Sequence, residues 1–165
     1  MYSNLLTKLM LTVATCALMG CGNPTAPFAT DPKYARDVID CIYAGSITPI
    51  EDTFGGDWAE TNYLADFVLE WTSEALDEQF GSVQQLTLQS SELKPAQGIF
   101  GVRRGCTITV WDVQADRDDF EMALYFKNSE LHAVMLKTNP TGDFEAPVFI
   151  AQEYRKEKGL PPGWK

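Results

Sequence analysis

Cysteine and histidine are the residue types best suited to chemistry in this 165-residue chain, which has four cysteines and one histidine. A thiolate is a nucleophile or a metal ligand, and a nearby histidine would act as its base. His132 has no evident relation in the sequence to any cysteine. The chain also lacks a Gly-rich phosphate loop, a Gly-x-Ser-x-Gly turn and a His-Glu-x-x-His pair. We therefore predict no catalytic residue, no cofactor and a role other than that of an enzyme.

Acidic residues are the second group with chemical potential. Asp plus Glu number 23 against 13 Lys plus Arg, for a formal charge of −10. Because phosphate binding needs a basic face, we expect no nucleic-acid partner. Asp112, Asp116, Asp118 and Asp119 are clustered, and Ca²⁺ prefers carboxylate oxygens, but the order of acids and glycine in an EF-hand loop is missing. We interpret the cluster as a solvated turn and predict no metal site.

The amino-terminal segment is mostly apolar and ends at a cysteine. Lys8 precedes residues 9–19, whose length suits the core of a signal peptide and is too short to span a bilayer. The last residues, Leu18-Met19-Gly20-Cys21, resemble the lipobox of bacterial lipoproteins. The resemblance implies that the Cys21 thiol takes a diacylglycerol, that residues 1–20 are removed, and that the new amino group takes a fatty acid such as palmitate. The alternative is an ordinary secretory signal with a chance cysteine.

The lipoprotein resemblance also implies a location. It puts the mature chain in the bacterial cell envelope, with the membrane as its partner through the lipid on Cys21. Gly22 stands where an Asp often signals retention at the inner membrane, which favours the periplasmic face of the outer membrane. Residues 21–30 contain two prolines and small polar residues, as a tether does. Because anionic lipid repels an acidic domain, we expect the domain to stand off the membrane.

Two cysteines remain once Cys16 leaves with the signal peptide and Cys21 carries lipid. Cys41 and Cys106 form an even pair in an oxidising compartment, which favours a disulfide. We assign Cys106 to the helix-facing side of its strand, so both thiols can point into one layer. The chain-entropy argument gives roughly 4 kcal/mol for such a bridge. The alternative is two buried free thiols.

Two helices are predicted before the strands. Asp31 suits the cap of the first, Pro32 its first turn and Gly45 its end. The second follows a capping-box pattern at residues 57–60 and runs to about Phe80. The predicted apolar stripe of the second helix consists of Leu64, Phe67, Val68, Trp71 and Ala75, with Leu76 at its edge.

The apolar period then changes to two, which indicates β-strands. The predicted strands lie around Leu86–Leu88, over 99–103, from Cys106 to Trp111, and over Phe120–Lys127 and Glu130–Lys137. The last two form a hairpin around the turn Asn128-Ser129, because that register sets apolar residues and opposite charges against each other. The predicted pairs are Lys127–Glu130, Phe126–Leu131, Tyr125–His132, Leu124–Ala133 and Met122–Met135.

Two helices followed by antiparallel strands predict an α+β fold with the helices on one face of the sheet. With helices at 35–44 and 64–80 and strands over 83–137, the domain 31–138 resembles the cystatin-like superfamily, which includes the nuclear transport factor two-like cone. The resemblance implies a curved antiparallel sheet of about four strands. In cone-shaped relatives the concave face holds a small ligand or packs against another subunit.

The carboxyl-terminal segment has a different composition. Prolines are spread through residues 139–165, and we predict an irregular tail there with a short helix over Ala151–Lys158. The role of the end, Leu160-Pro161-Pro162-Gly163-Trp164, is not predicted by its composition.

An apolar patch on the outer face of the sheet is the candidate binding site. Trp111 and Val113 fall opposite the strand face that we assign to the helices, so we expect them outside, with Tyr125 and His132 completing the patch. Alternatively, the carboxyl-terminal segment covers them. The predicted function is a membrane-anchored, non-catalytic binding module for another envelope protein or a second copy of the chain. The alternative is an enzyme that binds a small molecule on the concave face.

Overall fold

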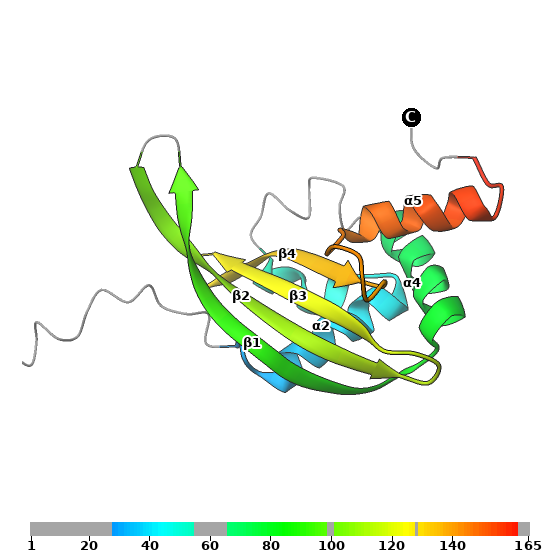
Figure 1. Cartoon of the computed structure of the whole chain (residues 1–165), viewed down its shortest axis with the longest axis horizontal. Helices are drawn as coiled ribbons and strands as arrows, with labels where there is room; N and C mark the ends of the chain where they lie inside the picture. The colour runs from blue at the N-terminus through cyan, green and yellow to red at the C-terminus, as the bar shows by residue number, and fades with distance from the viewer. Residues whose placement is uncertain (1–27, 55–65, 99–100, 128, 162–165) are drawn as a thin grey trace, which may run out of the picture.

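The structure is a computed structural model that describes residues 28–54, 66–98, 101–127 and 129–161 (Figure 1). Its elements are α2 (Pro32–Ala44), η1 (Thr48–Thr53), α4 (Asp66–Phe80), β1 (Val83–Gly98), β2 (Gly101–Ala115), β3 (Phe120–Lys127), β4 (Glu130–Lys137) and α5 (Pro147–Glu157). The predicted α+β class is confirmed, with helices before a four-stranded antiparallel sheet. Within these ranges, no helix combines the length and apolar character needed to cross a membrane.

Helix α2 begins and ends where the sequence predicts. The Asp31 carboxylate accepts a hydrogen bond from the Lys33 backbone N–H at 2.9 Å, which satisfies a donor that the helix cannot. Gly45 follows the last turn at φ 71°, a left-handed conformation that side chains rarely adopt, and its N–H bonds back to the Ile42 carbonyl. The buried face of the helix consists of Tyr34, Ala35, Val38, Ile39, Cys41 and Ile42.

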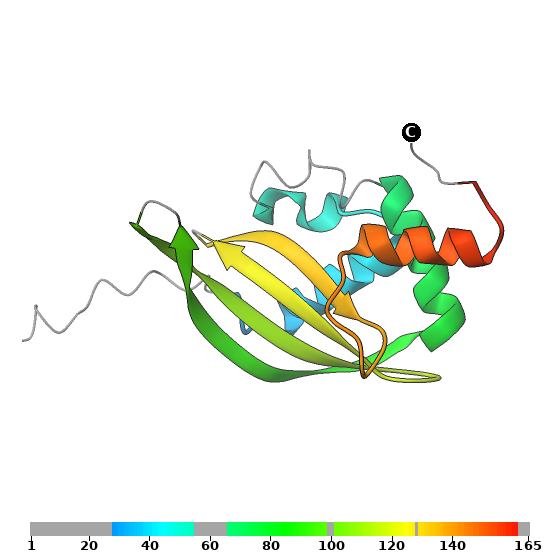
Figure 2. The ribbon, with the colours of Figure 1, turned by 45° about the horizontal axis from the view of Figure 1, so that its top comes forward.

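The sheet has the strand order β1-β2-β3-β4, and every neighbouring pair is antiparallel. Figures 1 and 2 show it curving around α2, with α4 across one end and α5 beside α4. Phe80 of α4 and Phe120 of β3 pack ring against ring at that end, with centroids 4.7 Å apart. The Thr72 hydroxyl of α4 donates to the Pro147 carbonyl at 3.0 Å, which fixes the start of α5.

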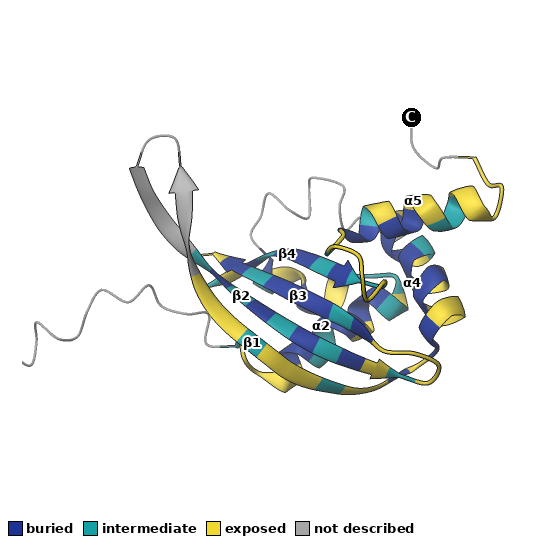
Figure 3. Ribbon diagram, viewed as in Figure 1, coloured by how far each residue is buried: buried dark blue, intermediate teal, exposed yellow. Residues whose placement is uncertain are grey.

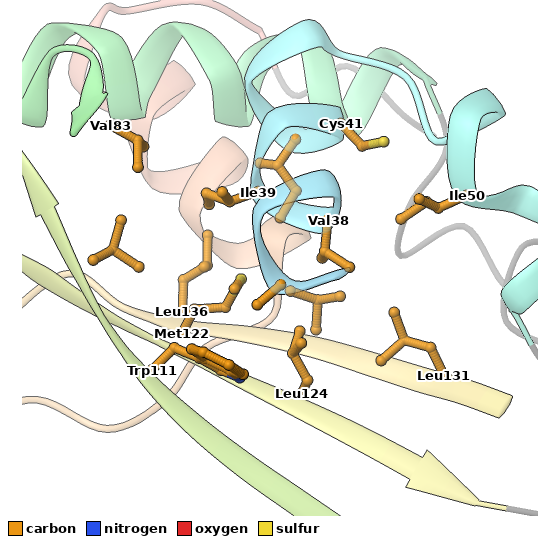
Figure 4. Packing of buried hydrophobic residues seen from close by; sticks show 14 of the residues in the cluster. Val38, Ile39, Cys41, Ile50, Val83, Trp111, Met122, Leu124, Leu131 and Leu136 are labelled. Atoms are coloured by element: carbon orange, nitrogen blue, oxygen red, sulfur yellow. The ribbon is translucent and has the colours of Figure 1, made fainter. Parts of the chain in front are cut away.

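The hydrophobic core lies between α2 and the concave face of the sheet (Figure 4). The sheet contributes Trp111, Met122, Leu124, Leu131 and Leu136, all fully buried. Val38 and Ile39 of α2 pack onto them. Burying one such side chain contributes about 1.5–3 kcal/mol, so this layer carries much of the stability.

The buried face of α4 differs from the predicted stripe. Val68, Ala75 and Leu76 are buried as predicted, but Leu69 is also fully buried, whereas Phe67 is 38% exposed. Trp71 is half-buried outside the core, and the Arg155 guanidinium of α5 lies 3.7 Å from its ring centroid. The prediction fails at Trp71 because α5, not the sheet, covers that residue. Leu64 lies outside the described residues. The predicted capping box at residues 57–60 lies outside the described residues.

The predicted facing of β2 was wrong. Trp111 and Val113 have no exposed surface, so this side of the strand faces the helices. Thr109 is also fully buried, and its hydroxyl accepts a hydrogen bond from the Trp111 indole N–H at 3.1 Å. The prediction placed Ile108 and Val110, rather than Thr109 and Trp111, on the helix-facing side. A buried threonine that satisfies an indole N–H reverses that assignment and turns Ile108 and Val110 outward.

The hairpin register is right at the turn and wrong beyond it. Lys127 pairs with Glu130 and Phe126 with Leu131, as predicted. A bulge then leaves His132 without a cross-strand partner, so that the pairs become Tyr125–Ala133, Leu124–Val134, Ala123–Met135, Met122–Leu136 and Glu121–Lys137. The bulge brings Val134 and Leu136 to the core face in place of the smaller Ala133 and the more exposed Met135.

The predicted disulfide is absent, and both cysteines are free. Cys41 is 3% exposed on α2, beneath the concave face of the sheet. Cys106 is half-buried, and alternation from the inward-facing Thr107 puts it on the outer face of β2. The sheet therefore separates the two thiols, and the assignment failed for the same reason as the facing of β2.

Two further predicted boundaries change. The separate strand expected over 99–103 belongs to β2 from Gly101 onward, and its first two residues lie outside the described ones. The segment expected to be an irregular tail forms α5 over Pro147–Glu157, longer than the short helix indicated. Before that helix, Glu145 exchanges two backbone hydrogen bonds of 2.8 Å with Leu136 and so covers part of the free edge of β4.

Candidate functional site

The outer face of the sheet carries a row of apolar side chains on three neighbouring strands. Ile108 lies beside Tyr125, and Val110 lies beside Ala123. Tyr125 and Ala123 in turn pair with Ala133 and Met135 of β4. The outer patch consists of the half-buried side chains of Cys106, Ile108, Val110, Tyr125 and Met135, with the buried Ala123 and Ala133 between them.

This composition departs from that of an ordinary solvated sheet face. An antiparallel sheet with one packed face normally alternates apolar residues inward with polar residues outward. The edge strand β1 has polar side chains on this face, because Thr87 and Glu92, the neighbours of Asp112 and Ile108, are exposed. The centre of the face does not, and Figure 3 shows its alternating buried and half-buried positions. The described helices lie on the opposite side of the sheet and leave the outer patch uncovered (Figures 1 and 2).

An acidic hollow adjoins the patch near the β2–β3 turn. Its volume is about 220 Å³, and its lining residues are Asp112, Gln114, Asp119, Phe120, Glu121, Lys137 and Pro140. Lys137 is bound to Glu121 at 2.9 Å, and Asp112 accepts a hydrogen bond from the Gln89 amide. Three carboxylates against one ammonium leave a local excess of negative charge, which attracts a cationic group.

The predicted patch residues divide between the core and the surface. Tyr125 belongs to the outer patch, whereas Trp111 and Val113 lie in the core. His132 is the extra residue of the bulge, and its Nε2 lies 3.8 Å from Glu130 Oε2 without a hydrogen bond. Ile108, Val110 and Met135, which lie on the surface, were not predicted there. Their alternation along the strands was the available signal, but the prediction assigned these residues to the helix-facing side of the sheet.

The aspartate cluster serves the turn that the sequence indicates. Asp116 accepts hydrogen bonds from the Ser82 backbone N–H at 3.2 Å and the Gln84 amide at 2.6 Å. Asp118 accepts the backbone N–H of Asp119. Within the described part of the chain, no three His, Cys, Asp or Glu side chains are grouped so as to hold a metal ion.

A second acidic groove, of about 430 Å³, lies between α4 and α5. Glu78 is bound there by the Lys158 ammonium at 2.6 Å and the Tyr154 hydroxyl at 3.1 Å. These bonds lower the pKa of Glu78 and raise that of Lys158. Glu145, Glu153 and Glu157 also line the groove. This groove was not predicted from the sequence, because α5 was not expected beside α4.

Two buried ionisable groups are held in their neutral forms. Burial, followed by the charges of Asp77 and Asp116, raises the pKa of Tyr43 to about 12. Burial also raises the pKa of the Cys41 thiol, with smaller contributions from Asp37 and Asp40. A thiol with a raised pKa has little thiolate at neutral pH, so Cys41 is a poor nucleophile.

Comparison with protein-family models, with curated proteins and with solved structures finds no match to this chain.

Proposed function

We propose that the protein is a lipid-anchored interaction module of the bacterial cell envelope that binds another protein on its outer patch. The observation that carries this proposal is the row of half-buried Ile108, Val110, Tyr125 and Met135 on a sheet face that no described helix covers. A contiguous apolar patch on the surface of a folded domain commonly marks a binding site, and these four side chains are partly exposed on one face.

The chemistry of the face favours one kind of partner. An apolar partner surface would bury the patch, and an Arg or Lys at its border would fit the hollow lined by Asp112, Asp119 and Glu121. A second copy of the chain would bring its own charge of −10, and like charges oppose association. The partner is therefore a different protein whose binding surface has an apolar centre and a cationic border.

The anchor rests on the sequence pattern that ends at Cys21. Phe28 is the first described residue after it, and its ring packs 4.5 Å from that of Tyr34 and 5.7 Å from that of Phe126. The segment between Cys21 and Phe28 spans at most about 25 Å when fully extended. A lipid on Cys21 would therefore keep the domain close to the membrane, on the periplasmic face of the outer membrane in a Gram-negative cell.

Quantitative co-purification from membranes tests the binding site. The full chain, Val110→Glu and Phe149→Glu are each isolated and their associated proteins compared. Phe149 is 52% exposed on α5, so Phe149→Glu adds the same charge at a site away from the patch. We expect Val110→Glu to lose a partner that both the wild type and Phe149→Glu retain, with unchanged circular dichroism. Equal recovery from all three, or recovery only of further copies of the chain, contradicts the proposal.

Metabolic labelling with a fatty acid tests the anchor separately. Cys21→Ala should leave the precursor uncut and unlabelled. Label that persists in Cys21→Ala contradicts anchoring at this residue, whatever the outcome for the outer patch.

A further inference from the structure

Strands β1 and β2 continue as a two-stranded ribbon beyond the rest of the sheet (Figure 1). β3 pairs with β2 only between Thr107 and Val113, whereas the pairing of β1 with β2 runs on to Gly98 and Gly101. The ribbon, as named here, consists of the described backbone segments 94–98 and 101–106. A two-stranded ribbon alone is only marginally stable in water, so an extended one suits contact with something outside the domain.

The ribbon is basic in an otherwise acidic chain. Lys94, Arg103 and Arg104 belong to it, and no Asp or Glu occurs between Leu93 and Trp111. Elsewhere acids predominate, since the whole chain has 23 of them against 13 Lys and Arg. The local charge of the ribbon is therefore opposite to that of the domain.

The base of the ribbon lies where the chain enters the domain. Phe28 packs on Phe126, which is the cross-strand neighbour of Thr107. Thr107 is in turn the neighbour of Leu93, the residue before the ribbon. A tether that joins Cys21 to Phe28 thus reaches the domain at its basic end.

The acidic groove lies at the opposite end of the sheet. On β4, Leu131 pairs with Phe126 near the ribbon, whereas Leu136 bonds to Glu145 at the other end of the strand. Glu145 lines the groove with Glu78, Glu153 and Glu157. The molecule therefore has a basic end beside the tether and an acidic end away from it.

We infer that the ribbon binds the anionic phospholipid surface of the membrane and so orients the domain with its α4–α5 end outward. The inference rests on the proposed lipid anchor, which brings the ribbon within reach of lipid headgroups. It refines the expectation from net charge alone, because only the acidic end is repelled. Each Lys or Arg near an anionic bilayer favours the docked state by about 5-fold, so three cations act together where one would be weak.

Hydrogen exchange on vesicles tests the inference. The chain from Cys21 onward, carrying an amino-terminal hexahistidine tag, is attached to nickel-chelating phosphatidylcholine vesicles with or without phosphatidylglycerol. Mass spectrometry measures exchange of backbone amides in the ribbon and, as an internal standard, in α5. The tag holds the protein on the vesicle whether or not cells lipidate Cys21, so the result does not depend on the anchoring test.

The outcomes that support and overturn membrane docking of the ribbon differ clearly. We expect phosphatidylglycerol to slow exchange of the ribbon amides at least 5-fold and to leave α5 unchanged. Lys94→Gln/Arg104→Gln should abolish the slowing, high salt should weaken it, and Lys156→Gln/Lys158→Gln, which removes the same charge from the far end, should preserve it. Ribbon exchange that is equal on both vesicles, or slowing that survives Lys94→Gln/Arg104→Gln, overturns the inference.

Discussion

The indole N–H of Trp111 donates a hydrogen bond to the hydroxyl of Thr109 at 3.1 Å, and both side chains are fully buried. The two residues are on the same face of β2, so this bond fixes which side of the strand enters the core. The outward position of Ile108 and Val110, on which the proposed docking site depends, follows from it.

Replacing Thr109 tests this relationship. Thr109→Val leaves the buried indole N–H without an acceptor, and we expect it to lower the free energy of unfolding by about 1–3 kcal/mol. Thr109→Ser retains the hydroxyl and should cost less, chiefly through the lost methyl group. Urea unfolding of the two variants measures the difference. A Thr109→Val protein as stable as Thr109→Ser would show that the bond does not orient the strand.

A second prediction follows from the bulge at His132, because beyond it the residues of β4 that face the core and those that face outward are the reverse of those in the register without a bulge. Leu136 is fully buried and Met135 lies on the outer patch. We expect Leu136→Ala to lower the free energy of unfolding by about 2–5 kcal/mol and Met135→Ala by much less. Denaturant unfolding compares the two variants directly. A larger loss of unfolding free energy for Met135→Ala would contradict the bulge and favour the register without it.

Local sequence signals predict some of these structural features and not others. The limits of α2 follow from Asp31 and Gly45, whose capping and left-handed preferences are local. The facing of β2 cannot be predicted in this way, because threonine occurs on either face of a strand when a buried hydrogen-bond partner is present. The bulge at His132 depends on which residues fill the core, and no local signal specifies it. Of the residues predicted for the outer patch, Tyr125 therefore lies there, whereas Trp111 and Val113 lie in the core.

The free thiols should differ in reactivity. Cys106 is half-buried on the outer face, whereas Cys41 is 3% exposed and has a raised pKa. We expect a thiol reagent to modify Cys106 in the native mature protein and Cys41 only after unfolding. Mass spectrometry of modified peptides distinguishes the sites. A peptide containing Cys41 joined to Cys106 in protein from the envelope would contradict the facing of β2.

Tyr43 should make stability depend on alkaline pH. Its hydroxyl is buried without a hydrogen-bond partner among the described residues, and its pKa is raised to about 12. Because the folded protein favours the protonated form, this contribution is complete below pH ~10 and is lost as pH rises toward 12. We expect Tyr43→Phe to lose less stability than the wild type over that interval and to be at least as stable at neutral pH. Identical pH dependence of urea unfolding would contradict the assignment.

Photo-crosslinking from the outer patch tests the docking site most directly. Tyr125 is replaced by p-benzoylphenylalanine, which preserves the aromatic ring, and Phe149 is replaced likewise as the control on α5. Irradiation of intact cells should join position 125, but not position 149, to one discrete protein of another sequence, and Val110→Glu in the same chain should abolish that product. Crosslinking from position 125 only to lipid or to a second copy of the chain, or equal products from both positions, would contradict the proposal that this face binds a protein partner.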